Sequence, residues 1–145
     1  MNVLSALSTA QYRGLALLWT TAILVAFSLP ASALSPARTV LAFDKLIHAV
    51  LFGVFGCLWM RALCPPDTEA MWTTLRRRGG QLFGVGVLFA GGTEVYQHLM
   101  PIRRLGDPYD ALADGLGLLV GILIYGLLVR WRRKQSSTAS APNDA

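Results

Sequence analysis

Residues 110–129 have the sequence DALADGLGLLVGILIYGLLV, and the basic run RWRRK follows directly at residues 130–134. Between Asp114 and Arg130 this stretch contains no charged residue. An α-helix needs about 20 mostly apolar residues to cross a bilayer, because each residue adds about 1.5 Å along the helix axis. The stretch therefore predicts a transmembrane helix whose charged ends lie near the two membrane surfaces.

Three further stretches of the chain have the same apolar character. They cover residues 14–29, 44–63 and 80–100, and prolines follow at Pro30, Pro65 and Pro101. The sequence therefore predicts an all-α, polytopic membrane bundle of four transmembrane helices, the fourth at about residues 110–129. We expect one transmembrane domain over residues 1–134 and a disordered, polar tail at residues 135–145.

The composition supports a membrane protein over a soluble one. Of the 145 residues, 54% are hydrophobic and only 14% are charged, against about 25% charged in ordinary soluble domains. The formal net charge of +5 comes from short basic runs beside apolar stretches. Such runs contact anionic lipid headgroups, so we expect membrane lipids, and no nucleic acid, as partners.

The basic residues also predict the orientation of the chain. With the N-terminus in the cytoplasm, nine basic residues lie on the inner side and four on the outer side. Cytoplasmic segments of membrane proteins have the excess of Lys and Arg. We therefore expect both termini in the cytoplasm, and a multi-pass protein of the cytoplasmic (inner) membrane.

The first apolar stretch has an alternative interpretation. Ala31-Ser32-Ala33 has the A-x-A form of a signal-peptidase site, and cleavage there would remove residues 1–33. We favour a retained helix, because the region before it is long and contains a single basic residue, Arg13.

Two pairs of glycines have the spacing that lets helices pack closely in lipid. These pairs are Gly80-x-x-x-Gly84 and Gly117-x-x-x-Gly121. We expect both pairs to pack helices within one chain, and the oligomeric state stays open.

Three groups of polar residues lie at the ends of the predicted helices. Asp44, Lys45 and His48 begin the second helix, Glu94, Gln97 and His98 end the third, and Asp110 and Asp114 begin the fourth. Residues three or four apart share one helical face, and the predicted orientation puts all three groups at the outer side of the membrane. This convergence predicts a polar site.

The carboxylates of this site need partners, because an unpaired charge within the membrane costs a few kcal/mol. Capping of a helix N-terminus offers a structural explanation for Asp44 and Asp110. It does not explain Glu94, because the C-terminus of a helix disfavours an anion. Glu94 is therefore the residue that most needs a functional explanation.

The stretches DKLIHAVLFGVFG (44–56), TEVYQHLMPIRR (93–104) and DALADGLGLLVG (110–121) together resemble the VanZ-like membrane protein family. The resemblance implies that the family's polar and glycine positions fall on Asp44, Lys45, His48, Glu94, Gln97, Pro101, Arg103, Asp110, Asp114, Gly117 and Gly121. Asp114 stands where many members have Asn. Either Arg103 or Arg104 matches the family arginine, and we favour Arg103.

The family is named for low-level resistance to the glycopeptide teicoplanin, and the resemblance implies no established reaction. Our first hypothesis is that the outer-leaflet site binds a lipid headgroup or a lipid-linked cell-envelope precursor, with a link to glycopeptide resistance. Arg103, Lys45 and His48 would bind phosphate, for which the guanidinium fork is well suited. The carboxylates would orient these bases, or bind an amine or a sugar hydroxyl.

Two alternatives remain. One is a membrane-embedded enzyme, whose candidate metal ligands are His48, Glu94, His98, Asp110 and Asp114. Without a metal, Glu94 and His48 would act as general base and acid, with Asp114 a further catalytic candidate. The sequence lacks a metalloprotease or nucleophile motif, so we expect no enzyme and no cofactor. The other is a structural or regulatory partner whose polar cluster only holds helices together.

Overall fold

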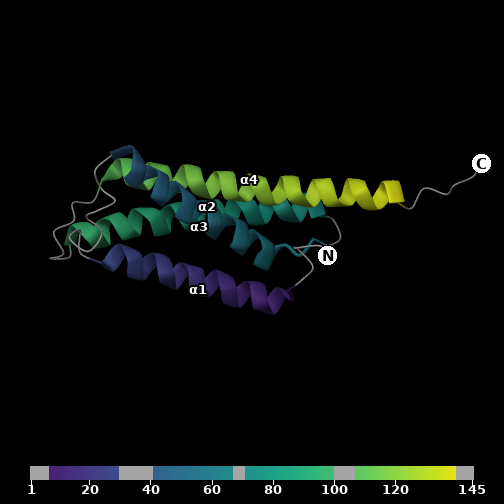
Figure 1. The fold of residues 1–145 in the computed structure, drawn as a ribbon, viewed down its shortest axis with the longest axis horizontal. Coiled ribbons are helices and arrows are strands. Elements are labelled where there is room, and N and C mark those ends of the chain that lie inside the picture. The colour runs from purple at the N-terminus through teal and green to yellow at the C-terminus, as the bar shows by residue number, and fades with distance from the viewer. Residues whose placement is uncertain (1–6, 30–40, 67–70, 100–106, 140–145) are drawn as a thin grey trace, which may run out of the picture.

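The computed structural model describes residues 7–29, 41–66, 71–99 and 107–139. The regular elements in these ranges are four helices, as predicted: α1 (Thr9–Ser28), α2 (Leu41–Leu63), α3 (Met71–Leu99) and α4 (Pro108–Ala139) (Figure 1). The segment Ala31-Ser32-Ala33 lies outside the described residues, so the alternative of cleavage there is untested.

The helices are longer than their predicted membrane spans. All four begin before the predicted residue, and α3 begins at Met71 instead of residue 80. α4 continues to Ala139, so the first part of the tail predicted to be disordered is helical. The physical reason is that Arg, Lys and Gln favour helices, so a basic run marks the end of a membrane span without ending the helix.

The first helix begins earlier than predicted because its first turn is capped. Ser8 and Gln11 form a capping box, in which the Ser8 hydroxyl accepts from the Gln11 backbone N–H at 3.2 Å. The Gln11 side chain in turn accepts from the Ser8 backbone N–H at 2.8 Å. Two N–H groups at the helix start are thereby satisfied, and α1 begins at Thr9 instead of residue 14.

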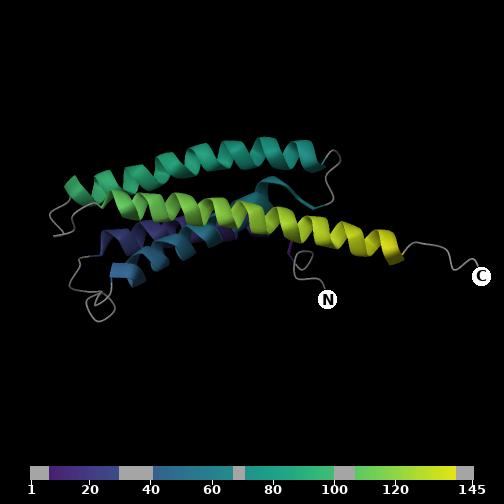
Figure 2. The same cartoon turned by 90° about the horizontal axis from the view of Figure 1, so that it is seen from above.

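The four helices run alternately up and down (Figures 1 and 2). The C-terminal ends of α1 and α3 lie with the N-terminal ends of α2 and α4 at one end of the bundle, on the left in Figure 1. α1, α2 and α4 are long and apolar enough to cross a membrane. α3 is less apolar than these three helices, and it runs in the direction opposite to α2 and α4. We call this shared end of the bundle the polar end.

The closest contact in the bundle is between the parallel helices α2 and α4. A methyl group added to Gly117 would overlap the backbone carbonyl of Ala49, and one added to Gly121 would overlap that of Gly53. Such contact between backbones requires glycine. The pair Gly117-x-x-x-Gly121 therefore packs helices within the chain, as predicted.

The prediction for the other glycine pair is wrong. A methyl group added to Gly80 or Gly84 would meet no atom of a neighbouring helix within 4 Å among the described residues. Gly79 and Gly86 face α4 instead, where they lie against the side chains of Ile122 and Leu118. The reason is that α3 has glycines on several faces, so spacing alone does not show how the helix is rotated.

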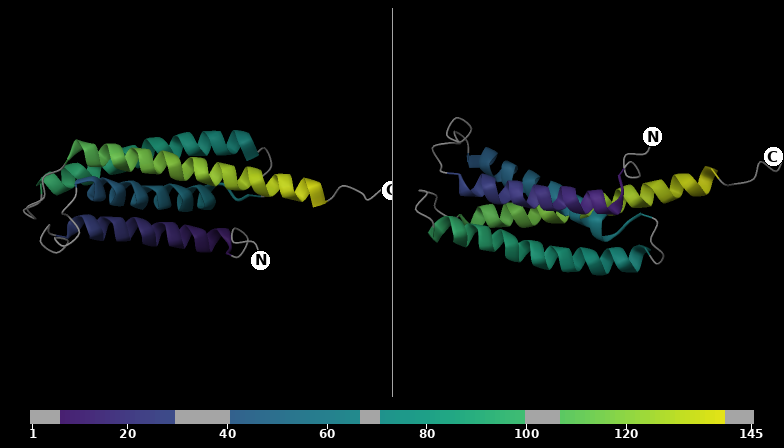
Figure 3. Two further views of the ribbon diagram at one scale, coloured as in Figure 1. Left: turned by 45° about the horizontal axis from the view of Figure 1, so that its top comes forward. Right: turned by 90° about the horizontal axis from the view of Figure 1, so that it is seen from below.

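α1 packs beside α2 (Figure 3). The Trp19 indole N–H donates to the carbonyl of Leu51 at 3.0 Å, and the Trp59 indole N–H donates to the Thr20 hydroxyl at 3.1 Å. These bonds satisfy polar groups that have no water to bond with inside a bilayer. They fix α1 against α2.

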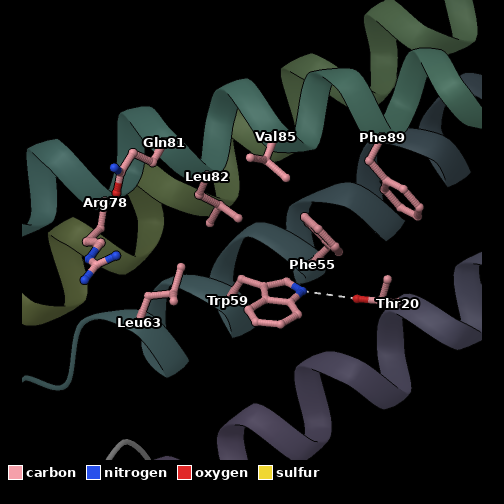
Figure 4. Close-up of a pocket in the computed structure, with 9 residues that line it drawn as sticks. All are labelled: Thr20, Phe55, Trp59, Leu63, Arg78, Gln81, Leu82, Val85 and Phe89. Atoms are coloured by element: carbon pink, nitrogen blue, oxygen red, sulfur yellow. Dashed lines mark hydrogen bonds between the residues drawn. The ribbon is translucent and has the colours of Figure 1, made fainter.

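An apolar groove of about 360 Å³ opens between α1, α2 and α3 (Figure 4). Phe55 and Trp59 of α2 face Leu82 and Phe89 of α3 across it, and Arg78 lies at one end. A second groove, lined by Leu24, Ser28, Leu88, Phe89, Gly92, Thr93 and Tyr96, continues towards the polar end. Phe89 lines both grooves, so the two form one apolar surface along α3.

We predict that Gly117→Ala lowers the free energy of unfolding in detergent by about 1–3 kcal/mol, because the added methyl group forces α2 and α4 apart. Gly115→Ala is the matched control on the same helix, since a methyl group there meets no neighbouring atom within 4 Å. Denaturant unfolding followed by circular dichroism measures both. Equal stabilities of the two variants would contradict the assigned contact.

Candidate functional site

The deepest polar pair at the polar end joins α2 to α4. The Nδ1 atom of His48 lies 3.0 Å from Oδ1 of Asp114. His48 is 3% exposed and Asp114 is fully buried. The ring of Phe27, near the end of α1, stacks on the imidazole with centroids 4.7 Å apart. Three helices thus enclose this pair. The interaction between the two side chains offsets part of the free-energy cost of burying them.

Lys45 lies one helical turn from His48, towards the end of the bundle. Its Nζ atom is 2.9 Å from Oδ2 of Asp107 and 2.9 Å from Oδ1 of Asp110. The side chains of Lys45 and Asp107 are about one third exposed. The hydrogen bond from Lys45 lowers the pKa of the Asp107 carboxyl below its usual value, so this carboxylate stays ionised at neutral pH. The polar end therefore has an accessible layer above a buried one.

Glu94 belongs to the buried layer, at 8% exposure. Its Oε2 atom accepts the backbone N–H of Asp107 at 2.9 Å. The C-terminal end of its own helix disfavours an anion, and for this reason Glu94 was hard to explain from the sequence. Glu94 instead lies against the N-terminal end of α4, where an anion is favoured and N–H groups need acceptors.

Asp107 connects the accessible layer to Glu94 and is not among the residues predicted for the site. Asp107 caps α4, since its Oδ1 atom accepts the backbone N–H of Tyr109 at 2.9 Å. Pro108 follows at the first position of the helix. Asp followed by Pro is a recognisable start of a helix, so the sequence did contain the signal.

The capping explanation for Asp44 and Asp110 is wrong. α2 begins at Leu41 and α4 at Pro108, so both carboxylates lie within the first turn instead of at the cap. Each is still favoured there by the positive end of the helix dipole. Asp110 is 7% exposed and bonds to Lys45, so its role is in the polar site.

The remaining predicted site residues lie beside the polar site, apart from it, or outside the described residues. Gln97 is buried, and its Nε2 atom donates to the carbonyl of Phe27 at 3.4 Å, which ties α3 to α1 beside the site. His98 is exposed and is not among the residues that come together. Arg103 and Arg104 lie outside the described residues, so the choice between them is untested.

Two groups of residues have metal-ligating atoms within 4.8 Å of one another: His48 with Glu94 and Asp114, and His48 with Asp44 and Asp110. Of the predicted metal candidates, the structure therefore brings together four and leaves His98 apart. The described part of the site contains five carboxylates, Asp44, Glu94, Asp107, Asp110 and Asp114, and two bases, Lys45 and His48. An excess of negative charge favours a cation as ligand.

The comparison with known families identifies the family of the chain. The model of the family described as VanZ/LLP1 matches residues 3–129, which include α1, α2, α3 and most of α4. The chain belongs to the VanZ/LLP1 family. Comparison with curated proteins and with solved structures gives no match. The VanZ/LLP1 match confirms the family that the motifs at residues 44–56, 93–104 and 110–121 indicated.

We predict different effects for two substitutions of Glu94 in this VanZ/LLP1 protein. Glu94→Gln retains an oxygen that can accept the Asp107 N–H, whereas Glu94→Ala leaves that N–H without an acceptor. The alanine variant should be less stable than the glutamine variant by about 1–3 kcal/mol. Denaturant unfolding in detergent, with a chelator present so that no divalent ion contributes, measures the difference. Equal stabilities would show that the bond to α4 does not form.

Proposed function

We propose that this VanZ/LLP1 protein is a multi-pass protein of the cytoplasmic membrane that binds the polar head of a lipid or of a lipid-linked cell-envelope precursor. The main supporting observation is the layered polar end, where partly exposed Lys45 and Asp107 lie above buried His48, Glu94 and Asp114. Helices that cross the membrane begin and end there, so its accessible layer is at the depth of lipid headgroups. The charge count favours the outer leaflet.

The charges of the site favour one kind of headgroup. Lys45 is already bonded to two carboxylates and His48 to one. The carboxylates are in excess, so they suit an ammonium group or a sugar hydroxyl better than the described bases suit a phosphate. We therefore propose recognition through an amine or hydroxyl of the headgroup.

The apolar surface along α3 supports a ligand with an acyl or prenyl chain. The second groove includes Thr93 and Tyr96, which lie on the same turns of α3 as Glu94 and Gln97. Tyr96 is 3.3 Å from the Ser28 hydroxyl, so the groove reaches the end of α1 as well. A chain in this groove would place its head beside the polar site.

The same proposal offers an explanation for glycopeptide resistance. A protein that binds an envelope precursor in the outer leaflet would reduce the amount that a teicoplanin-type antibiotic can reach. Expression of this chain should then raise the inhibitory concentration of such an antibiotic.

Native mass spectrometry of the detergent-purified protein tests headgroup binding. We predict that phosphatidylethanolamine and a glucosyl diacylglycerol are retained severalfold better than phosphatidic acid of the same acyl length, because the head of phosphatidic acid has neither an amine nor a sugar hydroxyl. Asp107→Asn should reduce this selectivity, because it removes an accessible charge while Asn still caps α4. Arg77→Gln, an exposed charge at the other end of α3, is the control and should have no effect.

Equal retention of the three lipids by the unaltered protein and by Asp107→Asn would overturn the proposal. The bound lipid would then be the ordinary annulus around the helices.

A further inference from the structure

Two buried carboxylate oxygens at the polar end have no hydrogen-bond partner among the described residues. They are Oε1 of Glu94 and Oδ2 of Asp114. Glu94 is 8% exposed and Asp114 is fully buried. A buried acceptor without a donor is costly, and a buried charge without a counter-charge more so. No donor among the described residues reaches these two atoms, so a cation bound between them would offset the cost of burying them.

The two bases in the described part of the site, Lys45 and His48, do not fill this need. Lys45 is held by Asp107 and Asp110 at 2.9 Å each, in the layer above. His48 is hydrogen-bonded to the other oxygen of Asp114. In the buried layer, the carboxylates of Glu94 and Asp114 therefore have only the imidazole of His48 between them. A divalent cation bound there would balance their charge.

We infer that His48, Glu94 and Asp114 bind one divalent transition-metal cation, Zn²⁺ or Mn²⁺. One ligand atom from each lies within 4.8 Å of the others. Ligands placed about 2.0–2.2 Å from a tetrahedral ion are roughly 3.4 Å from one another. The Nδ1–Oδ1 distance of 3.0 Å between His48 and Asp114 already approaches that value. The Asp114 carboxylate would bind the ion through both oxygens, including the unpartnered Oδ2, and Glu94 through its unpartnered Oε1.

The surroundings of His48 also suit a metal-bound imidazole. A histidine that binds a metal through one nitrogen usually donates its other N–H to a carboxylate, which fixes the ring. The Nε2 atom of His48 lies 4.0 Å from Oδ2 of Asp110, a carboxylate that Lys45 holds in place. In this arrangement the ion takes the place of the Nδ1 proton, and Phe27 keeps the ring in position by stacking.

The ligand set indicates which ions suit the site. An imidazole nitrogen favours Zn²⁺ over Mg²⁺ or Ca²⁺, and two carboxylates make Mn²⁺ a second choice. Three protein ligands leave a coordination position free. Because Lys45 and Asp107 lie above the site, that position would be available to an oxygen atom of a headgroup. The inference thus deepens the proposed headgroup site and rests on it for a biological role, but metal binding can be tested without any lipid.

Metal content of the purified protein tests the inference. The protein is purified in detergent with an affinity tag that contains no histidine, incubated with ZnCl₂ or MnCl₂, desalted, and analysed by inductively coupled plasma mass spectrometry. We expect about one ion per chain, and a thermal midpoint that rises by several degrees on metal addition. Glu94→Gln and His48→Gln should lose the ion, whereas His98→Gln, which replaces an exposed histidine on the same helix as Glu94, should retain it.

Two results would overturn the inference. Unaltered protein with no bound ion and no thermal shift would show that the site does not bind a divalent cation. This measurement uses only the unaltered protein, so its result does not depend on how a variant folds. An ion that survives Glu94→Gln but not His98→Gln would show a surface site. If the unaltered protein binds the ion but shows no lipid selectivity, the proposed headgroup function is rejected and the metal site stands.

Discussion

The backbones of α2 and α4 touch at two glycines of α4, and this contact arranges the residues of the polar end. Gly117 and Gly121 let α4 approach Ala49 and Gly53 so closely that a side chain at either glycine has no room. His48 precedes Ala49, and Asp114 lies one turn before Gly117. The glycine contact therefore determines that the imidazole and the carboxylate meet at 3.0 Å.

The positions of the other polar residues follow from the contact between His48 and Asp114. Once α2 and α4 run side by side, Lys45 lies beside the start of α4, where it bonds to Asp107 and Asp110. The end of α3 lies against the same start, and Glu94 accepts the N–H of Asp107. A site that would be costly deep in a membrane is thus stabilised by paired charges and a helix dipole near its surface. Two of its carboxylate oxygens have no partner among the described residues, which supports the proposed binding of a ligand there.

Much of this arrangement could be predicted from the sequence. Apolar length and proline positions gave four helices, and residue spacing placed His48, Glu94 and Asp114 at one level. What could not be predicted was helix rotation and the contacts between helix ends. Gly80 and Gly84 had suitable spacing but face away from the neighbouring helices. Glu94 looked unfavourable because its partner, the start of α4, belongs to another helix. Asp107 lies before the predicted fourth span, so the charge pattern within the spans did not indicate it.

A double-mutant cycle between His48 and Asp114 tests most directly whether the α2–α4 contact creates the site. The free energy of unfolding is measured in bicelles, with a chelator present, for the unaltered protein, His48→Gln, Asp114→Asn and the double variant. A direct bond between buried residues of neighbouring helices predicts a coupling energy of about 1 kcal/mol. Additive effects of the two substitutions, with a coupling near zero, would contradict the account.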